Sequence, residues 1–297
     1  RALDRFGKGV RTGARDAILS DEATPETKGK VFGFHRSMDT LGAVIGPLLA
    51  LMYLYYYPED YKTLFFLAFI PGLLAVIASF YIKKEESNIN PFTIKTSFTS
   101  FLNYWKSGPS AYRKLVFGLL FFTLFNSSDI FLLLQVKQAG FDDSMVIGVY
   151  IFYNLIYALF AFPMGILADY FGLKTIFILG LGLFAFVYLG MAVFNSQTMI
   201  FVLFFVYGLY ASMTEGIAKA WITNITEKKD TATAIGTFTG LQSICAMLAS
   251  SLTGFLWYQY GAGTAFLITS IAAFVLIFYF IALPHPNFLK TTAKNGS

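Results

Sequence analysis

The chain has little charge and almost no cysteine or histidine. Only 13% of its 297 residues are charged, and it contains one Cys and two His. A single cysteine excludes disulfide frameworks, cysteine-based zinc sites and iron–sulfur clusters, and two distant histidines make a metal site improbable. Apolar residues dominate instead, with 56% hydrophobic, 19% aromatic and a mean hydropathy of +0.62. This composition excludes a disordered chain or a nucleic-acid binder and indicates a membrane protein.

Long apolar runs recur along the whole sequence. A membrane-spanning helix needs about 20 mostly apolar residues. The sequence predicts eight such helices, over residues 32–57, 62–82, 113–137, 144–168, 173–195, 198–225, 231–258 and 263–283. Residues 1–20 are expected to belong to a further helix, which is highly charged. We therefore expect an all-α, multi-pass membrane protein in contact with the lipid bilayer.

Residues 83–112 form the only long polar connection in the sequence. Apolar residues recur there at helical spacing opposite polar ones, as in Phe98, Leu102 and Trp105 against Lys95 and Lys106. This pattern predicts a short amphipathic helix on the membrane surface. A loosely ordered linker is the alternative interpretation.

The lysines and arginines indicate an orientation in the membrane. If the 83–112 connection faces the cytoplasm, only Lys62 and Lys137 lie on the opposite side. The cytoplasmic side then collects most of the 22 basic residues, namely Lys28, Lys30, Arg36, Lys83, Lys84, Lys95, Lys106, Arg113, Lys114, Lys174, Lys228, Lys229, Lys290 and Lys294. Because cytoplasmic loops are enriched in Lys and Arg, the sequence predicts that the connection and the C-terminus are cytoplasmic.

The two halves of the sequence share a sparse internal repeat. A shift of 203 residues aligns Gly13 with Gly216 and Gly33 with Gly236. Repeats of this kind are common in transporter folds. The same shift implies that about 90 to 100 residues of the first half precede Arg1, so we expect the sequence to be a fragment.

Three short motifs occur in a fixed order. In the segment "RFGKG", Arg5 is followed four residues later by a glycine, with Lys8 directly before it. The segments "TLGAVIGPLLA" and "GILADYFGLK" carry Gly42, Gly46, Pro47, Gly165, Asp169, Gly172 and Lys174. These segments resemble, in turn, the fourth-helix motif, the fifth-helix exporter signature and the second-half cytoplasmic loop motif of the major facilitator superfamily of secondary transporters.

The resemblance covers the whole chain and implies a twelve-helix fold in which two six-helix bundles rock about a central site. The chain then corresponds to the end of helix four and helices five to twelve. Residues 1–82 would be the remainder of the N-terminal bundle, 83–112 a cytoplasmic linker, 113–284 the C-terminal bundle and 285–297 a cytoplasmic tail. The exporter-like signature favours efflux, and import is the alternative.

The first helix carries a basic face. At 100° per residue, counted from Arg5, four of its basic residues fall within an arc of about 120°; they are Arg5, Lys8, Arg11 and Arg15. Ionisable groups inside a bilayer are costly, so we expect this face to line the central cavity and to bind an anionic solute. In the alternative interpretation the helix ends near Arg11, and the last arginines lie in cytoplasmic water.

Two carboxylates, Asp129 and Glu215, and the amine of Lys219 are candidates for proton coupling. Asp129 lies in an otherwise apolar run, where a buried carboxylate can exchange a proton. Glu215 precedes Lys219 by four residues, which predicts an ion pair within one helix, at the repeat equivalents of Thr12 and Asp16. The alternatives are a capped aspartate near the outer surface and a purely structural pair.

The remaining candidates are expected to line the cavity or to gate it. The lining candidates are Asn126, Tyr150, Tyr153, Asn154, Tyr207 and Tyr210, with ordinary helix packing as the alternative for the tyrosines. The gate and conformational candidates are Asp39, Gly42, Gly46, Pro47, Gly165, Asp169, Gly172 and Lys174. Among them, Asp169 is expected to accept hydrogen bonds from a helix N-terminus, whose dipole favours a carboxylate.

The sequence therefore predicts a secondary active transporter of a small organic solute, anionic or amphipathic, driven by protons through alternating access. No GxxxxGK[ST] phosphate loop or catalytic constellation occurs in the sequence, so neither ATP use, enzymatic activity, a metal nor a cofactor is expected. We expect a monomer in a bacterial inner membrane, without nucleic-acid partners. A non-transporting sensor or scaffold with a transporter fold is the alternative.

Overall fold

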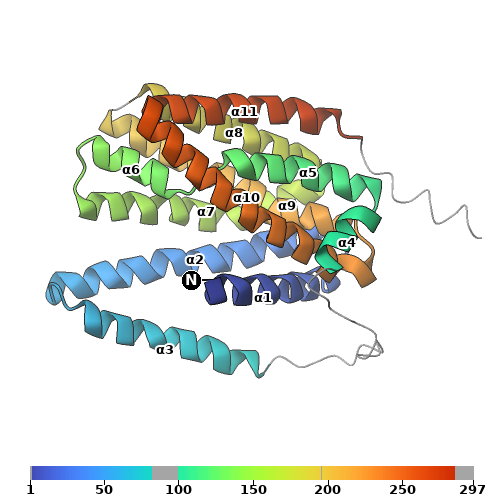
Figure 1. Cartoon of the computed structure of the whole chain (residues 1–297). Helices are drawn as coiled ribbons and strands as arrows, with labels where there is room; N and C mark the ends of the chain where they lie inside the picture. The colour runs from blue at the N-terminus through green and yellow to red at the C-terminus, as the bar shows by residue number, and fades with distance from the viewer. Residues whose placement is uncertain (1, 82–99, 195, 285–297) are drawn as a thin grey trace, which may run out of the picture.

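The computed structural model is all-helical (Figure 1). It describes residues 2–81, 100–194 and 196–284, with side chains from Thr12 in the first helix and from Tyr104 in the fourth. The helices are α1 (Ala2–Asp21), α2 (Lys28–Tyr56), α3 (Tyr61–Ser79), α4 (Ser100–Ser107), α5 (Ser110–Phe125), α6 (Ile130–Gln138), α7 (Asp143–Phe171), α8 (Leu173–Val193), α9 (Gln197–Asn224), α10 (Thr231–Tyr260) and α11 (Ala262–Ala282), with a 3₁₀ turn at Lys228–Asp230.

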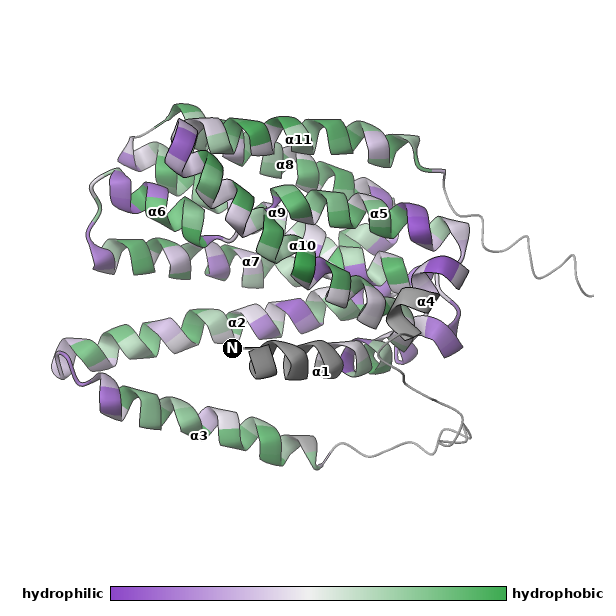
Figure 2. Ribbon diagram, viewed as in Figure 1, coloured by the Kyte–Doolittle hydropathy of each residue, from purple (hydrophilic) through white to green (hydrophobic). Residues whose placement is uncertain are grey.

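Eight segments of the described chain are long and apolar enough to cross a membrane. Figure 2 shows hydrophobic residues along most of these helices and hydrophilic ones mainly at the turns. Many large apolar side chains point outward, as with Phe278 on α11 and Phe186 on α8, which suits lipid contact. Together with the family assignment below, this confirms the expected all-α membrane fold.

One predicted helix is interrupted. The apolar run over 113–137 is not one helix, because α5 ends at Phe125 and α6 begins at Ile130. The intervening residues Asn126–Asp129 have short polar side chains, which compete with the helix for backbone hydrogen bonds. The Ser128 hydroxyl, for example, accepts a hydrogen bond from the backbone N–H of Ile130 at 3.4 Å. The polar break thus lies inside a single membrane span.

The helices form two groups, α1–α3 and α5–α11, which lie one above the other in Figure 1. The chain alternates between two ends of the molecule. One end, named here the linker face, holds α4, the turn after α1 and the turns between α7 and α8 and between α9 and α10. The turns between α2 and α3, α6 and α7, and α10 and α11 lie at the opposite face.

Helices α2 and α7 form the most extensive contact between the two groups. Small residues permit it, because a Cβ added to Gly33 would lie 2.5 Å from the carbonyl oxygen of Ala161. Toward the middle of the span, the Ser37 hydroxyl donates to the carbonyl oxygen of Ala158 at 2.5 Å. Close approach through small residues is typical of helix packing in membranes, where no hydrophobic driving force holds helices together.

The described part of the linker includes a helix, α4, which packs against α10. Its Tyr104 ring stacks edge-on against Tyr112 at the start of α5, with centroids 5.1 Å apart. Residues 94–99 of the expected amphipathic segment and the tail over 285–297 lie outside the described residues. The Tyr104 contact anchors the end of the linker to the C-terminal group.

Two further contacts between the groups are related to each other by the repeat. Helix α1 packs on α10, where a Cβ added to Gly13 would lie 3.6 Å from the Cα of Gly236. Helix α2 packs on α9, where a Cβ added to Gly216 would lie 3.2 Å from the carbonyl oxygen of Phe32. A shift of 203 residues carries α1 onto α9 and α2 onto α10, so it exchanges the two contacts. A pseudo-twofold relation between the groups has this consequence.

Candidate functional site

A cavity of about 480 Å³ lies between the two groups of helices. Its wall combines residues of α1 and α2 with residues of the second group; they are Thr12, Arg15, Arg36, Asp39, Leu119, Phe122, Thr123, Asn126, Phe177, Tyr210, Thr214, Glu215, Ala218, Lys219, Phe238, Thr239, Gln242, Ser243 and Ala246. The volume suits a small organic molecule. Because both groups contribute walls, any relative motion of the groups changes the cavity.

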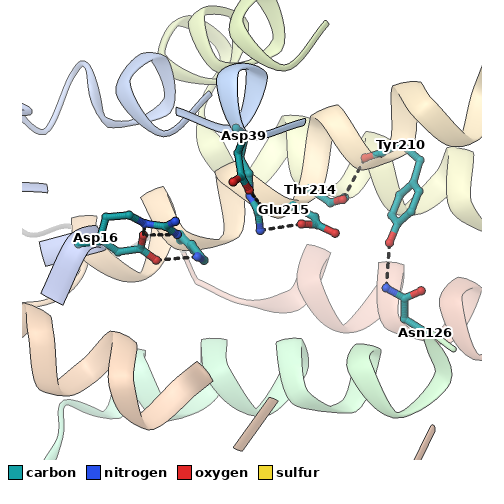
Figure 3. A network of polar contacts seen from close by, with 9 residues as sticks. Asp16, Asp39, Asn126, Tyr210, Thr214 and Glu215 are labelled. Atoms are coloured by element: carbon teal, nitrogen blue, oxygen red, sulfur yellow. Dashed lines mark hydrogen bonds and ion pairs between the residues drawn. The ribbon is translucent and has the colours of Figure 1, made fainter. Parts of the chain in front are cut away.

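The buried carboxylate of Asp16 holds two cations that line the cavity, Arg15 and Lys219; Figure 3 shows the contacts around Asp16. Lys219 donates to it across the interface at 2.6 Å, and the neighbouring Arg15 donates at 3.1 Å. Asp16 and Lys219 are 203 residues apart, so they occupy equivalent positions in the two repeats. Arg15 is therefore neutralised in part rather than free, and the basic side chains of Arg5, Lys8 and Arg11 lie outside the described side chains.

A second group of charges is organised around Arg36 of α2 (Figure 3). Its guanidinium donates to Asp39 at 3.2 Å and pairs with Glu215 of α9 at 2.7 Å. The predicted ion pair between Glu215 and Lys219 is therefore wrong. Each of these two residues instead finds a partner on the opposing group, where Arg36 and Asp16 project toward α9.

Asp129 lies at the break between α5 and α6 and is bound by two tyrosine hydroxyls. Tyr153 of α7 and Tyr207 of α9 each donate to its carboxylate at 2.6 Å. None of the ion pairs found within the described ranges includes Asp129. Asp129 is thus a carboxylate within a membrane span. Among the described residues, its charge is stabilised by hydrogen bonds and not by an ion pair.

A short polar link connects this break to the cavity. Asn126 donates through Nδ2 to the Tyr210 hydroxyl at 3.0 Å, and both residues line the cavity (Figure 3). The Tyr207 and Tyr210 rings lie 5.3 Å apart on the same helix. The tyrosine that binds Asp129 therefore lies next to a tyrosine that lines the cavity.

The other tyrosines of the expected lining do not reach the cavity wall. Tyr150, Tyr153, Asn154 and Tyr207 are absent from the residues that line it, which corrects that prediction. They pack instead between α7, α9 and the helix break: the Tyr150 ring meets Tyr153 edge-on at 5.5 Å, and Asn154 donates to the carbonyl oxygen of Tyr150. Side-chain direction, which helical spacing alone does not give, decides this difference.

Polar contacts join the two groups at the linker face. The Asp169 carboxylate at the end of α7 accepts hydrogen bonds from the backbone N–H groups of Gly29 and Lys30, both at 2.7 Å. These N–H groups belong to the first turn of α2, where a carboxylate is favoured. Lys28 donates to the Ser20 hydroxyl at 2.7 Å and to the carbonyl oxygen of Thr223 at 3.1 Å. The linker face is closed in this conformation.

Close packing of glycines accompanies these contacts. A Cβ added to Gly29 would lie 2.5 Å from the carbonyl oxygen of Gly165 and 2.7 Å from a carboxylate oxygen of Asp169. After α7, Gly172 turns the chain with a φ of 96°, a conformation that favours glycine. Lys174 then donates to the carbonyl oxygens of Ile281 and Leu283 at 2.9 and 2.5 Å. It anchors the end of α11 rather than the interface.

The exporter-like segment lies in the half of α2 that approaches the opposite face. Pro47 is inside the helix, and among the described residues no atom outside the helix's own neighbouring backbone lies within 4 Å of a Cβ added to Gly42 or Gly46. The contacts that close the linker face lie at least nine residues before Gly42, at Gly29 and Gly33. Gly42 and Gly46 therefore make no close contact with another described helix in this conformation.

The sequence did not identify Lys28 as a residue of the site, and it did not show that Asp16 and Arg36 bind partners on the opposing group of helices. The repeat contained a usable signal for Asp16, since the 203-residue shift pairs it with Lys219. Ser20 and Thr223, the two partners of Lys28, are also 203 residues apart. Positions related by the shift thus meet near the axis that relates the halves. No comparable signal marked Arg36 as the partner of Glu215.

Comparison with known proteins agrees with the geometry. The family profile of the Major Facilitator Superfamily matches residues 1–156 and 140–296. An uncharacterised MFS-type transporter of Methanocaldococcus jannaschii is 33% identical over 280 residues, covering 92% of this chain and 68% of its own length. An uncharacterised protein of Mycobacterium tuberculosis is 23% identical over 299 residues, covering 93% of this chain and 68% of its own length.

Among solved structures, the human organic anion transporter MFSD10 is similar with a TM-score of 0.72 at 16% sequence identity. The match covers 90% of this chain and 67% of that protein, and at this identity it shows the fold alone. With eight spans, a cavity between two helix groups and a profile match along both halves, the chain is an integral multi-pass membrane protein of a transporter family rather than an enzyme family. It belongs to the major facilitator superfamily.

Proposed function

We propose that the protein moves a small, amphipathic organic solute across the membrane by alternating access, coupled to protons. The cavity between the two groups of helices is the proposed solute site, because it combines charged groups with aromatic walls such as Phe122 and Phe238. The contacts at the linker face provide one closed end. Rocking of the groups would break those contacts and expose the cavity to that face.

Asp129 is the proposed proton carrier, and its surroundings are the observation that carries the proposal. A carboxylate in a membrane span is costly when charged, by about 2.5 to 3.5 kcal/mol at the centre. Here two tyrosine hydroxyls support the charged form, while no ion pair has to be broken when a proton binds. Charged and neutral forms can therefore both exist in this site. That is the requirement for a group that loads and releases a proton.

The link from Asp129 to the cavity supports coupling to the solute. A protonated Asp129 is neutral, so its charge no longer has to be stabilised by two tyrosine hydrogen bonds. The hydroxyl of Tyr207 is then free to reorient. Tyr207 lies against Tyr210, which lines the cavity and whose hydroxyl accepts a hydrogen bond from Asn126. Protonation is thus proposed to alter the hydrogen bonds offered to the solute.

Glu215 is the second proposed carrier. It lines the cavity and pairs with Arg36, so a proton on Glu215 would release one contact between α2 and α9. Lys219 participates through its pair with Asp16, which joins α9 to α1. These two ion pairs cross the interface. In the proposed cycle, rocking separates the partners of each pair, and water then hydrates the separated charges.

The linker face is proposed to be cytoplasmic because the basic residues concentrate there. Asp169 is the proposed latch of this face, since its two hydrogen bonds to α2 exist only when the groups touch. Gly165 allows the close approach, and Gly42, Gly46 and Pro47 provide the flexible part of α2 away from the latch. Efflux is the proposed direction, and a monomer in a bacterial inner membrane the proposed setting.

The test is flux in proteoliposomes with an imposed pH gradient and a panel of metabolites and drugs. The wild type is expected to move at least one compound in a gradient-dependent manner, and Asp129→Asn is expected to abolish the dependence. Lys137→Gln is the control, because Lys137 pairs with Asp143 at the opposite face, away from the cavity. Gradient-dependent flux that survives in Asp129→Asn would reject the carrier. Ligand binding without any flux would favour a sensor with a transporter fold.

A further inference from the structure

The charged side chains at the cavity separate into two clusters of opposite sign. The basic cluster consists of Asp16 with Arg15 and Lys219, so it contains two cations and one carboxylate. The acidic cluster consists of Arg36 with Asp39 and Glu215, so it contains two carboxylates and one cation. Among the described side chains of the site, one cluster therefore carries a net charge of about +1 and the other about −1.

In both clusters the central ion is more deeply buried than the outer ions that reach the cavity wall. Asp16 is almost fully buried, whereas the Arg15 side chain is 33% exposed. Arg36 is 22% exposed, whereas Asp39 and Glu215 are 51% and 46% exposed. The uncompensated positive charge is thus presented by Arg15 with Lys219, and the uncompensated negative charge by Asp39 with Glu215.

The two clusters are neighbours along α9. Glu215 and Lys219 are four residues apart, which corresponds to a rise of about 6 Å. In Figure 3 the pairs around Asp16 and the pairs around Glu215 follow one another along the same side of the helix. Both clusters border the same cavity, so one small molecule that carries both charges can contact them together.

The rest of the wall is neutral and includes four aromatic side chains. Phe122, Phe177, Phe238 and Tyr210 come from four different helices of the second group. Such a wall accommodates an apolar or ring-bearing body, and aromatic faces also attract a cation. Hydroxyl and amide groups of Thr214, Thr239, Gln242 and Ser243 supply hydrogen bonds without further charge.

We propose that the cavity binds a zwitterionic solute with an apolar body, such as an amino acid or a related molecule that carries both an amine and a carboxylate. Its ammonium group lies at the acidic cluster, its carboxylate at the basic cluster, and its body against the aromatic wall. A singly charged solute leaves the net charge of one cluster unmatched, which disfavours it relative to a zwitterion. The inference deepens the proposed function, since it names the solute class of the transport site.

The test uses matched triplets of ligands that share one body and differ only in charge. Phenylalanine, phenethylamine and 3-phenylpropionate form one triplet; tryptophan, tryptamine and indole-3-propionate form a second, and leucine with its amine and acid analogues a third. Binding to the purified, lipid-reconstituted protein is measured by calorimetry. In at least one triplet the zwitterion is expected to bind at least tenfold more tightly than both analogues.

Two outer-ion variants make the assignment specific. Arg15→Gln leaves the basic cluster neutral, so the zwitterion should lose its advantage over the amine and keep it over the acid. Asp39→Asn leaves the acidic cluster neutral, so the zwitterion should lose its advantage over the acid and keep it over the amine. Lys137→Gln, which changes charge at the opposite face, should leave all preferences unchanged.

Two outcomes would overturn the inference: preference for the acid or the amine within every triplet, or no binding by any zwitterion. Gradient-driven flux of other compounds together with either outcome would leave the proposed transport function standing. Tight zwitterion binding without gradient-driven flux would have the opposite meaning, because it would support the solute class and reject coupled transport.

Discussion

Substitution of Gly165 by alanine should open the linker face. A Cβ at this position would overlap the backbone of Gly29 and would lie 3.2 Å from the Cα of Gly33, with no flexible side chain able to move aside. Overpacking of this kind costs about 1 to 3 kcal/mol. Because the Gly165 contact with Gly29 and Gly33 joins the two groups at this face, we expect the cost to fall on the closed state. The equilibrium should shift toward the open state by about 5- to 150-fold.

Distances between spin labels measure this shift directly. Labels at Glu26→Cys and Lys229→Cys lie on exposed turns of the two groups at the linker face, and Cys245→Ser removes the single native thiol. The Gly165→Ala variant should show a larger population of long distances than the parent. Gly148→Ala is the matched control on the same helix, since no atom lies within 4 Å of its added Cβ. Identical distance distributions for both variants would refute the reasoning.

Three further outcomes are expected. Asp169→Asn keeps a hydrogen-bond acceptor but loses the charge, so turnover should change severalfold while solute Kd stays within about twofold; a large change in Kd with unchanged turnover would contradict a latch. Lys174→Met removes two hydrogen bonds to the end of α11 and should destabilise that helix by about 1 kcal/mol, seen as faster amide hydrogen exchange in its last turn but not in α8. Burial raises the pKa of Tyr104 to about 12, above the usual tyrosine value of about 10, so its contribution to docking of α4 is complete below about pH 10 and is lost as the pH rises toward 12. Fluorescence of Trp105 as the only tryptophan should report this transition, and Tyr104→Phe should abolish it.

The membrane spans were predictable because hydropathy is a local property. Runs such as 173–195 and 263–283 closely match α8 and α11, since an apolar stretch of that length has no other stable form in a bilayer. The break at Asn126–Asp129 was visible as a polar group of residues, but apolar residues on both sides concealed its effect on the helix. Local competition for backbone hydrogen bonds decided the outcome there.

The charge partners could not be derived from one helix at a time. Helical spacing paired Glu215 with Lys219, yet groups on α1 and α2 reach both residues and bind them instead. Contacts of this type depend on how the two groups of helices face each other, which sequence periodicity does not encode. The repeat provided the missing relation in one case, because equivalent positions such as Asp16 and Lys219 meet near the pseudo-twofold axis.

Solute-driven proton movement is the most direct test of coupled transport through Asp129. Proteoliposomes that contain a pH-sensitive dye are prepared with equal pH on both sides, and phenylalanine or the fastest-moving compound of the flux panel is added outside. The wild type should change the internal pH in step with solute entry, and Asp129→Asn should leave the internal pH constant. Solute entry without a pH change in the wild type, or an equal pH change in Asp129→Asn, would contradict the account.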